Sequence, residues 1–321
     1  MQFIYFAEGQ AKFVSVHRGV KRVFARPFEG DYNIVAELVA EAVSNRLPVR
    51  PLTIVAHQHV AVQTREVVEE FKSSRKVGKS IVDKMVNVDL PTFAGTTLIH
   101  NDAVFFRVDG EQPVIDVTGE TGRRVVATLS ATFCDSAFIA AINAALPSFR
   151  RGDIEFVSGT HATALHVLPD PVRDGLCTLI DCGHEATIVA GVLGDSLVNM
   201  KTIPFGFKHI VDDICAIMDT DRDAAKTLIF DTPIMVKPTT KAAEIIKCRL
   251  DEIAPAVRDA IIRADLQLLQ RPIFMTGELL HIIGARHYIA EQIKMPITAA
   301  ACPFSGSNVA AERAVIELLK C

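Results

Sequence analysis

The spacing of apolar residues along the chain predicts a mixed α/β fold. Within residues 2–25, apolar residues at 3–6 and at 13, 14 and 16 lie on either side of a turn at residues 7–10, which is typical of a β-hairpin. Asp31 can cap a helix, and apolar residues then recur at spacings of three and four until Pro48. A further strand over residues 52–62 follows. The chain therefore begins with two strands, a helix and a third strand.

This pattern stops at residue 64. Residues 64–80 carry many charges and predict a helix, and Asp135 can cap an apolar helix that ends near residue 146. Between them lie predicted short strands around residue 98 and over residues 104–108, 114–117 and 125–132. Because a similar α/β pattern resumes after residue 147, we predict that residues 64–147 form a small inserted α+β subdomain.

The rest of the chain repeats the opening plan. A strand is expected over residues 154–157 and a very apolar strand over residues 176–181, followed by a turn and two further strands over residues 187–192 and 196–203. This repetition predicts a duplicated fold. The first half takes residues 1–63 with 148–175, and the second takes residues 176–321.

Later elements of the second half are mainly helical. We expect helices over residues 210–218 and 241–270, the second with a break or kink near Pro255, and a last helix over residues 308–320. A buried strand over residues 272–275 separates them.

Composition and charge exclude several classes of function. The 321 residues include 34 Lys and Arg against 38 Asp and Glu, a formal charge of -4, with no block of clustered basic residues, so nucleic acid is not an expected ligand. No apolar run approaches the roughly 20 residues of a membrane span, and the first residues lack a basic signal-peptide region. Seven cysteines without a CxxC pair do not form a disulfide framework. We expect a cytoplasmic protein.

Two turns carry candidate chemistry. In the first, an apolar strand ends at Asp181 and is followed by a hairpin turn that contains Gly183. The backbone N–H groups of such a turn can bind phosphate, and the aspartate can orient metal-bound water. The second runs from Thr276 through Gly277 to Gly284, where backbone can approach a flat ligand. Each pattern is also common in turns that serve structure alone.

Other motifs are weaker. Gly78-Lys79-Ser80 resembles the end of a P-loop, but Ser73 stands where the first glycine belongs and no strand is predicted before it. His57 and His59 share a strand face, yet no further metal ligand lies at a suitable spacing, so a structural pair is favoured. HExxH, GxSxG and GxGxxG sequences are absent, which disfavours hydrolase and Rossmann dehydrogenase functions.

The order of the motifs is more specific than any one of them. A hairpin, an insert, the segment CTLIDCGHEATIVAG, a Pro-Phe-Gly turn, long helices and the segment FMTGELLHIIG follow one another as in the actin and sugar-kinase superfamily. Within it the chain resembles the bacterial FtsA and PilM proteins. The resemblance implies a duplicated actin-like, ribonuclease-H-like fold, with an SHS2-type insert at residues 64–147 and a fourth subdomain trimmed around residues 219–240.

The resemblance also implies a nucleotide site. Its first phosphate loop corresponds to Gly9, Gln10 and Lys12, and its metal-positioning carboxylate to Asp181. The remaining positions belong to the second phosphate loop, the next turn and the adenosine turn: Gly183, His184, Thr187, Gly206, Gly277, Glu278 and Gly284.

The departures from the family pattern all weaken this site. Ala7 replaces an aspartate, His184 and Glu185 replace glycines, and Glu278 and Leu279 replace another glycine pair. The ribose-binding segment falls at residues 224–228, where both of its polar partners are lost. Side chains obstruct the backbone approach, and a glutamate repels phosphate. We therefore expect weak or absent binding of ATP and magnesium, no catalytic residue, and an ATPase activity that is lost or weak.

These features favour a scaffold or adaptor in bacterial cell division or in pilus or secretion assembly. Its partners would be proteins, and the insert could support self-assembly. The family's C-terminal membrane helix has no counterpart before Cys321, so membrane association would require a partner. The alternative is an active, ATP-binding, filament-forming actin homologue. A third class, a sugar- or acetate-kinase-like phosphotransferase, would need a catalytic carboxylate beside a substrate cleft, and the sequence offers no candidate besides Asp181.

Overall fold

The computed structural model describes residues 1–7, 9–17, 20–150, 152–234, 237–263 and 271–300. Its first half is built on a five-stranded sheet in the order β3-β2-β1-β4-β8. The strands are β1 (Gln2–Ala7), β2 (Gln10–His17), β3 (Val20–Pro27), β4 (Leu52–Ala56) and β8 (Ile154–Ser158). Helices α1 (Ile34–Ser44) and α3 (Ser136–Ala145) cover one face of this sheet, and α4 (Gly159–Val167) contributes Ala162 to the other face. The predicted opening hairpin is β1 and β2, and β3 extends it by a strand that the sequence pattern did not indicate.

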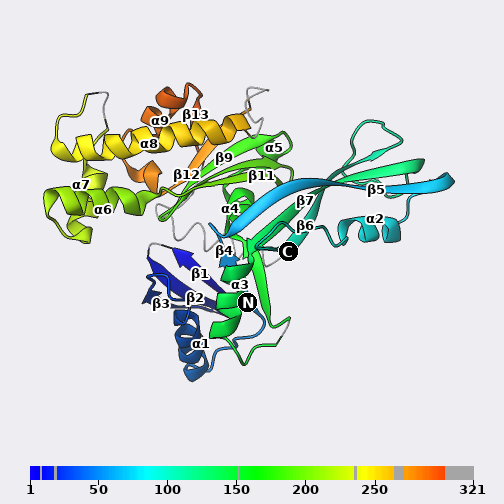
Figure 1. Cartoon of the computed structure of the whole chain (residues 1–321), viewed down its shortest axis with the longest axis horizontal. Helices are drawn as coiled ribbons and strands as arrows, with labels where there is room; N and C mark the ends of the chain where they lie inside the picture. Colours follow the sequence, from blue (N-terminus) through cyan, green and yellow to red (C-terminus); the bar gives the residue numbers. More distant parts are fainter. Residues whose placement is uncertain (8, 18–19, 151, 235–236, 264–270, 301–321) are drawn as a thin grey trace.

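The second half repeats this topology. Its sheet has the order β11-β10-β9-β12-β13, built from β9 (Cys177–Cys182), β10 (Thr187–Leu193), β11 (Ser196–Ile203), β12 (Ile273–Gly277) and β13 (Ile297–Ala299). In both sheets the central strand pairs antiparallel with the next strand in sequence and parallel with a later one. The predicted duplication is therefore confirmed (Figure 1).

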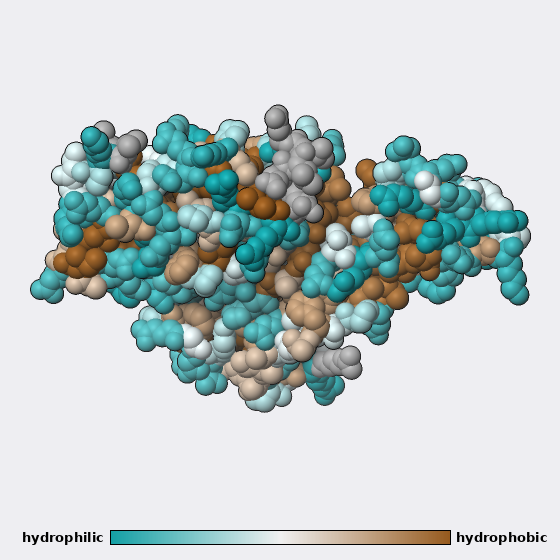
Figure 2. Space-filling view, turned by 45° about the horizontal axis from the view of Figure 1, so that its top comes forward, coloured by the Kyte–Doolittle hydropathy of each residue, from teal (hydrophilic) through white to brown (hydrophobic). Residues whose placement is uncertain are grey.

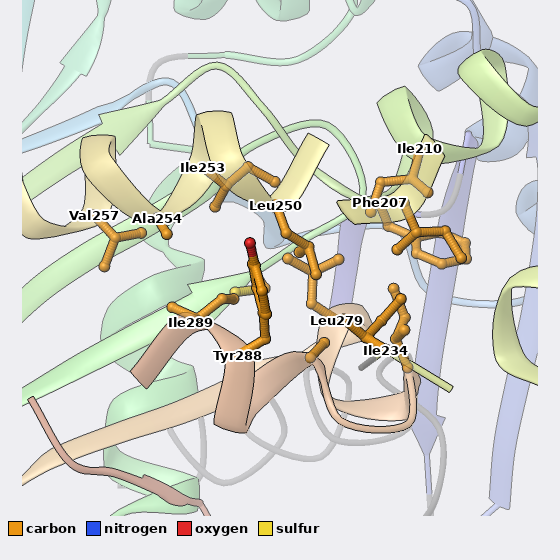
Figure 3. Packing of buried hydrophobic residues seen from close by; sticks show 14 of the residues in the cluster. Phe207, Ile210, Ile234, Leu250, Ile253, Ala254, Val257, Leu279, Tyr288 and Ile289 are labelled. Carbon is orange, nitrogen blue, oxygen red and sulfur yellow. The ribbon is translucent and has the colours of Figure 1, made fainter. Parts of the chain in front are cut away.

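Helices cover the second sheet. They are α5 (Asp170–Arg173), α6 (Phe207–Met218), α7 (Arg222–Asp231), α8 (Lys241–Arg263), the short 3₁₀ helix η1 (Glu278–His281) and α9 (Ala285–Ile293). Leu250, Ile253 and Val257 of α8 pack against Ile289 and its neighbours on α9 to form the core shown in Figure 3. Pro255 lies inside α8, which continues past it, so a break there was wrong, while a kink stays a prediction. The predicted extension of this helix over residues 264–270 lies outside the described residues. The predicted helix over residues 308–320 lies outside the described residues.

A three-stranded sheet projects from the body as an arm (Figure 1). It consists of β5 (Val60–Lys76), β7 (Thr121–Asp135) and β6 (Thr96–Val108) in that spatial order, with α2 (Lys79–Val86) packed on one face. Apolar residues lie along the arm and hydrophilic residues at its tip (Figure 2). The limits of the insert at residues 64 and 147, its SHS2 character and the trimmed segment around 219–240 stay predictions.

The charged helix predicted over residues 64–80 was wrong, because most of this segment belongs to β5. Its exposed fraction alternates along the strand, with Val67 and Phe71 partly buried and Val68 exposed. Pairing with β7 runs from Val60 to Glu70 and resumes at Arg75 and Lys76 after a register shift, and such tertiary pairing overrides local helix propensity. The strand predicted over residues 52–62 is likewise two strands, β4 and the start of β5.

The other predicted boundaries differ less. The two short strands around residues 98 and 104–108 are parts of β6, and residues 114–117 contribute only a bridge from Val114 to Phe106. Asp135 caps α3, because its carboxylate accepts a hydrogen bond of 2.8 Å from the Ala137 amide. Asp31 instead accepts from the amide of Asn33, the residue that precedes α1.

The arm contacts the second half as well as the first. β5 and β7 lie beside β11, and the Ser130 hydroxyl of β7 donates a hydrogen bond to the Leu197 carbonyl of β11. His161 contacts the turn that precedes β11, because its Nε2 lies 2.6 Å from the carbonyl oxygen of Asp195. Among the described helices, none has both the length and the apolar character needed to cross a membrane.

Candidate functional site

The hairpin turn of each half lies at the candidate site. Gly9 adopts a φ of +70° in the β1–β2 turn, a left-handed conformation that glycine accommodates without strain. In the β9–β10 turn the Gly183 amide donates a hydrogen bond to the Ala186 carbonyl at 3.0 Å. His184 lies between these two residues and is therefore part of the tight turn. Gly9 and His184 come from different halves, and the two turns meet at His184.

His184 connects three of the predicted site segments. Its Nε2 lies 3.9 Å from the position that a Cβ atom would take at Gly9. Its Nδ1 lies 3.2 Å from the Glu278 carboxylate, and both side chains are only 9% exposed. The imidazole therefore occupies the space between the first turn, the second turn and the start of η1.

Asp181 lies next to this pair at the end of β9. The pairing of β9 with β12 places Asp181 opposite Thr276, and Cys182 opposite Gly277. Burial, with a smaller contribution from the negative charge of Glu278, raises the pKa of Asp181 to about 6. The site thus holds two neighbouring carboxylates, which makes it unfavourable for an anionic ligand.

The first turn of α6 is already hydrogen-bonded to the β9–β10 turn. The amides of Phe207 and Lys208 donate to the carbonyls of Gly183 and His184 at 3.0 and 2.9 Å. These are helix N-terminal donors of the kind that often bind phosphate. Because protein carbonyls accept them here, these two are not available to an anion.

Gly206 and Thr187 fix this close contact. A Cβ atom at Gly206 would lie 2.4 Å from the His184 carbonyl oxygen, so only glycine allows the approach. Thr187 is fully buried, and its hydroxyl donates to the Phe205 carbonyl at 2.8 Å. Both residues have structural roles in this arrangement.

The predicted adenosine turn is covered by protein. Gly277 and Gly284 have φ values of +93° and +87°, and Cβ atoms there would lie 2.3 Å from the Cys182 carbonyl oxygen and 2.5 Å from that of Ile234. The Ile234 amide also donates to the Ile283 carbonyl at 2.7 Å. Leu279 is fully buried near Ile234 in the core of Figure 3. Neighbouring backbone therefore lies directly against both glycines on the side where a side chain would project.

The remaining site residues lie further out. Gln10 is exposed, and Lys12 places its Nζ 5.8 Å from the centroid of the Tyr5 ring. Glu185 forms an ion pair of 3.3 Å with Lys208, which offsets its charge locally. Residues 224–228, the predicted ribose segment, lie in α7.

Other motifs have structural surroundings. Burial lowers the pKa of His57 to about 4, and its ring lies against Gly159 at the start of α4, where a Cβ atom would come within 2.2 Å. The His59 ring stacks on Phe138 with centroids 4.4 Å apart. Gly78 precedes α2 in the arm and follows strand β5, contrary to the sequence expectation that no strand precedes it. Among the described residues, no three metal-binding side chains lie together.

The sequence named these residues only as candidates and did not predict how they meet. The contact between His184 and Glu278 joins residues 94 positions apart, and it depends on the pairing of β9 with β12. The covering of Gly284 by Ile234 had no signal in the sequence pattern. The replacement of two glycine positions by a histidine and a glutamate was the signal that could have suggested the first contact.

The duplicated sheets with their shared topology define an actin-like ATPase fold. Comparison with solved structures supports this class over nearly the whole chain. PilM in the PilM–PilN type IV pilus biogenesis complex is 15% identical, with a TM-score of 0.62, over 97% of this chain and 95% of that one. The MamK double helical filament is 10% identical with a TM-score of 0.56, over 100% of this chain and 99% of that one.

MreB 5 of Spiroplasma citri bound to AMPPNP is 9% identical with a TM-score of 0.55, over 99% of this chain and 96% of that one. At these identities the likeness is one of fold. No protein-family model matches the chain. No curated protein matches it in sequence.

Proposed function

We propose that this chain is an actin-fold scaffold or adaptor that binds protein partners and has lost ATP hydrolysis. The observation that carries the proposal is the position of His184, between Gly9 and the Glu278 carboxylate. Phosphate binding in a turn needs backbone donors that face an open space. Here an imidazole takes that space, and the nearby carboxylates of Asp181 and Glu278 would repel phosphate.

The partner side of the proposal is supported by fold likeness. PilM has been solved with PilN in a type IV pilus biogenesis complex, and its fold matches this chain over almost its full length. By analogy we propose a role in a bacterial assembly of the pilus, secretion or cell-division type, in the cytoplasm and near a membrane only through a partner. Fold analogy leaves the identity of that partner open.

The second candidate is an active filament-forming ATPase. Two matched folds favour it, since MamK has been solved as a double helical filament and MreB 5 with AMPPNP. Asp181 and four of the candidate site glycines, Gly183, Gly206, Gly277 and Gly284, are also present. This candidate requires His184 and Glu278 to move away from each other when a nucleotide arrives.

Isothermal titration calorimetry of the full chain with magnesium and ATP distinguishes the two candidates. We expect no binding heat at protein concentrations near 100 µM, a regime in which a Kd of roughly 1 mM or weaker escapes detection. Micromolar binding with phosphate release would overturn the scaffold proposal. Negative-stain electron microscopy with and without ATP tests the filament candidate, because nucleotide-dependent filaments would support it directly.

A further inference from the structure

Strand β3 forms an open edge of the first sheet. Among the described strands it pairs with β2 alone, and Figure 1 shows it at the margin of the sheet, on the side away from the arm. The corresponding edge strand of the second sheet, β11, lies beside β5 of the arm, and the opposite edge of that sheet, β13, has only three residues. β3 is eight residues long, which makes it a suitable template for another strand.

The register identifies the backbone groups that face outward. The Phe28 amide donates to the Gly9 carbonyl at 2.7 Å, and the antiparallel pairing continues from there without a shift. Since hydrogen-bonded pairs alternate in such a ladder, the even-numbered residues of β3 bond to β2. The N–H and C=O groups of Val23 and Ala25 therefore point away from the sheet. A side-chain contact supports this direction for Ala25, because the Arg26 guanidinium donates a hydrogen bond to the Ala25 carbonyl at 2.9 Å.

The edge is basic and partly apolar. Val20 and Val23 are 58% and 43% exposed. Residues 10–27 contain five basic residues and no acidic one, although the whole chain has a formal charge of -4: Lys12, Arg18, Lys21, Arg22 and Arg26. These residues are spread along the sequence, so they form no basic block. Within the β2–β3 hairpin, the register places Lys12 and Lys21 on one face of the sheet and Arg22 and Arg26 on the other. Arg26 also forms an ion pair with Glu41 of α1.

We propose that an extended, acidic segment of a partner protein binds here by adding a strand to β3. Outward N–H and C=O groups at Val23 would supply main-chain affinity, and the basic side chains would select an acidic sequence. A second copy of this chain is disfavoured, because pairing two β3 edges would oppose like charges. This inference rests on the proposed function in one respect, because it requires a protein partner. The experiments on β3 are separate from those on the His184 site, so one proposal can fail while the other holds.

The test measures fluorescence anisotropy of a labelled peptide with alternating glutamate and valine, about ten residues long. We expect saturable binding to the full chain that weakens about tenfold or more in Val23→Pro, because proline removes the outward donor without removing a bond to β2. The matched control, Val23→Thr, keeps the donor and should bind as the unchanged chain does. Circular dichroism checks that both variants fold.

Two further probes separate the alternatives. A peptide with lysine in place of glutamate should bind at least tenfold more weakly, and Arg22→Glu should weaken binding of the acidic peptide. Equal binding of the two peptides, equal binding by Val23→Pro, or no binding of the acidic peptide would overturn the inference. Tighter binding to phosphatidylglycerol vesicles that Val23→Pro leaves unchanged would also overturn it, in favour of a lipid surface.

Discussion

The Nδ1 atom of His184 and the carboxylate of Glu278 lie 3.2 Å apart, although 94 positions separate them in the sequence. The contact closes the space between the β9–β10 turn and η1, two segments that the parallel pairing of β9 with β12 brings together. Two side chains from segments that are distant in the sequence thus form one buried pair. This pair is the structural reason to expect that ATP does not bind.

Removing the pair should restore part of a nucleotide site. We predict that His184→Gly with Glu278→Gly binds ATP and magnesium roughly ten- to a hundredfold more tightly than the unchanged chain, because space opens and one negative charge is lost. Adding Ala7→Asp should increase the dependence on magnesium, since a second carboxylate can then orient metal-bound water. Calorimetry measures both effects.

The matched control for this experiment changes the same residue types on the surface of α9. His287→Ala with Glu291→Ala should leave ATP affinity unchanged, because both side chains are exposed and lie outside the site. If opening the site gives no gain in affinity while the variant remains folded, other features such as the backbone over Gly284 exclude the nucleotide.

Asp181 should make stability depend on pH. Its pKa is raised from 3.8 to about 6 in the folded state, so the folded protein binds this proton more readily than the unfolded chain. Stability from this group is present at low pH and is lost as pH rises between about 4 and 6. We predict that Asp181→Asn is more stable than the unchanged chain at pH 7.5, by about 3 kcal/mol, with a smaller difference at pH 5.

Urea unfolding at the two pH values measures this difference. Asp89→Asn is the matched control, since it makes the same change at an exposed position and should have little effect at either pH. A stabilisation by Asp181→Asn that is equal at pH 5 and pH 7.5 would contradict the raised pKa.

The fold could be predicted largely from the order of motifs, while individual elements could not. The repeated strand and turn pattern around Phe6 and Asp181 indicated the duplication, which the two matching sheets confirm. Strand β5 was mistaken for a helix because its charges are compatible with either structure, and pairing with β7 decides the outcome. Strand β3 was missed because none of its side chains is fully buried, so its apolar alternation is weak.

The site shows the same division between local and long-range information. Local sequence identified His184 and Glu278 as departures from a glycine pattern and Asp181 as a retained carboxylate. Their contact and the raised pKa depend on how distant strands pair. The backbone of Ile234 over Gly284 depends on the path of a loop, which no residue pattern encodes.

The link between the arm and the second half should contribute measurably to stability. The Ser130 hydroxyl donates to the Leu197 carbonyl in a buried position. We predict that Ser130→Ala lowers the free energy of unfolding by about 1 kcal/mol, because the carbonyl loses this donor. Hydrogen exchange in β11 should also accelerate. Ser74→Ala, at an exposed position of β5, is the control and should change neither quantity.

Gly277 should be intolerant of any side chain for two separate reasons. Its φ of +93° is strained for other residues, and a Cβ atom would lie 2.3 Å from the Cys182 carbonyl oxygen. We therefore predict that Gly277→Ala lowers the free energy of unfolding by about 2–4 kcal/mol. Gly175→Ala is the matched control, since nothing lies within 4 Å of its Cβ position. Equal stability of the two variants in urea unfolding would show that β9 and β12 do not approach as closely as described.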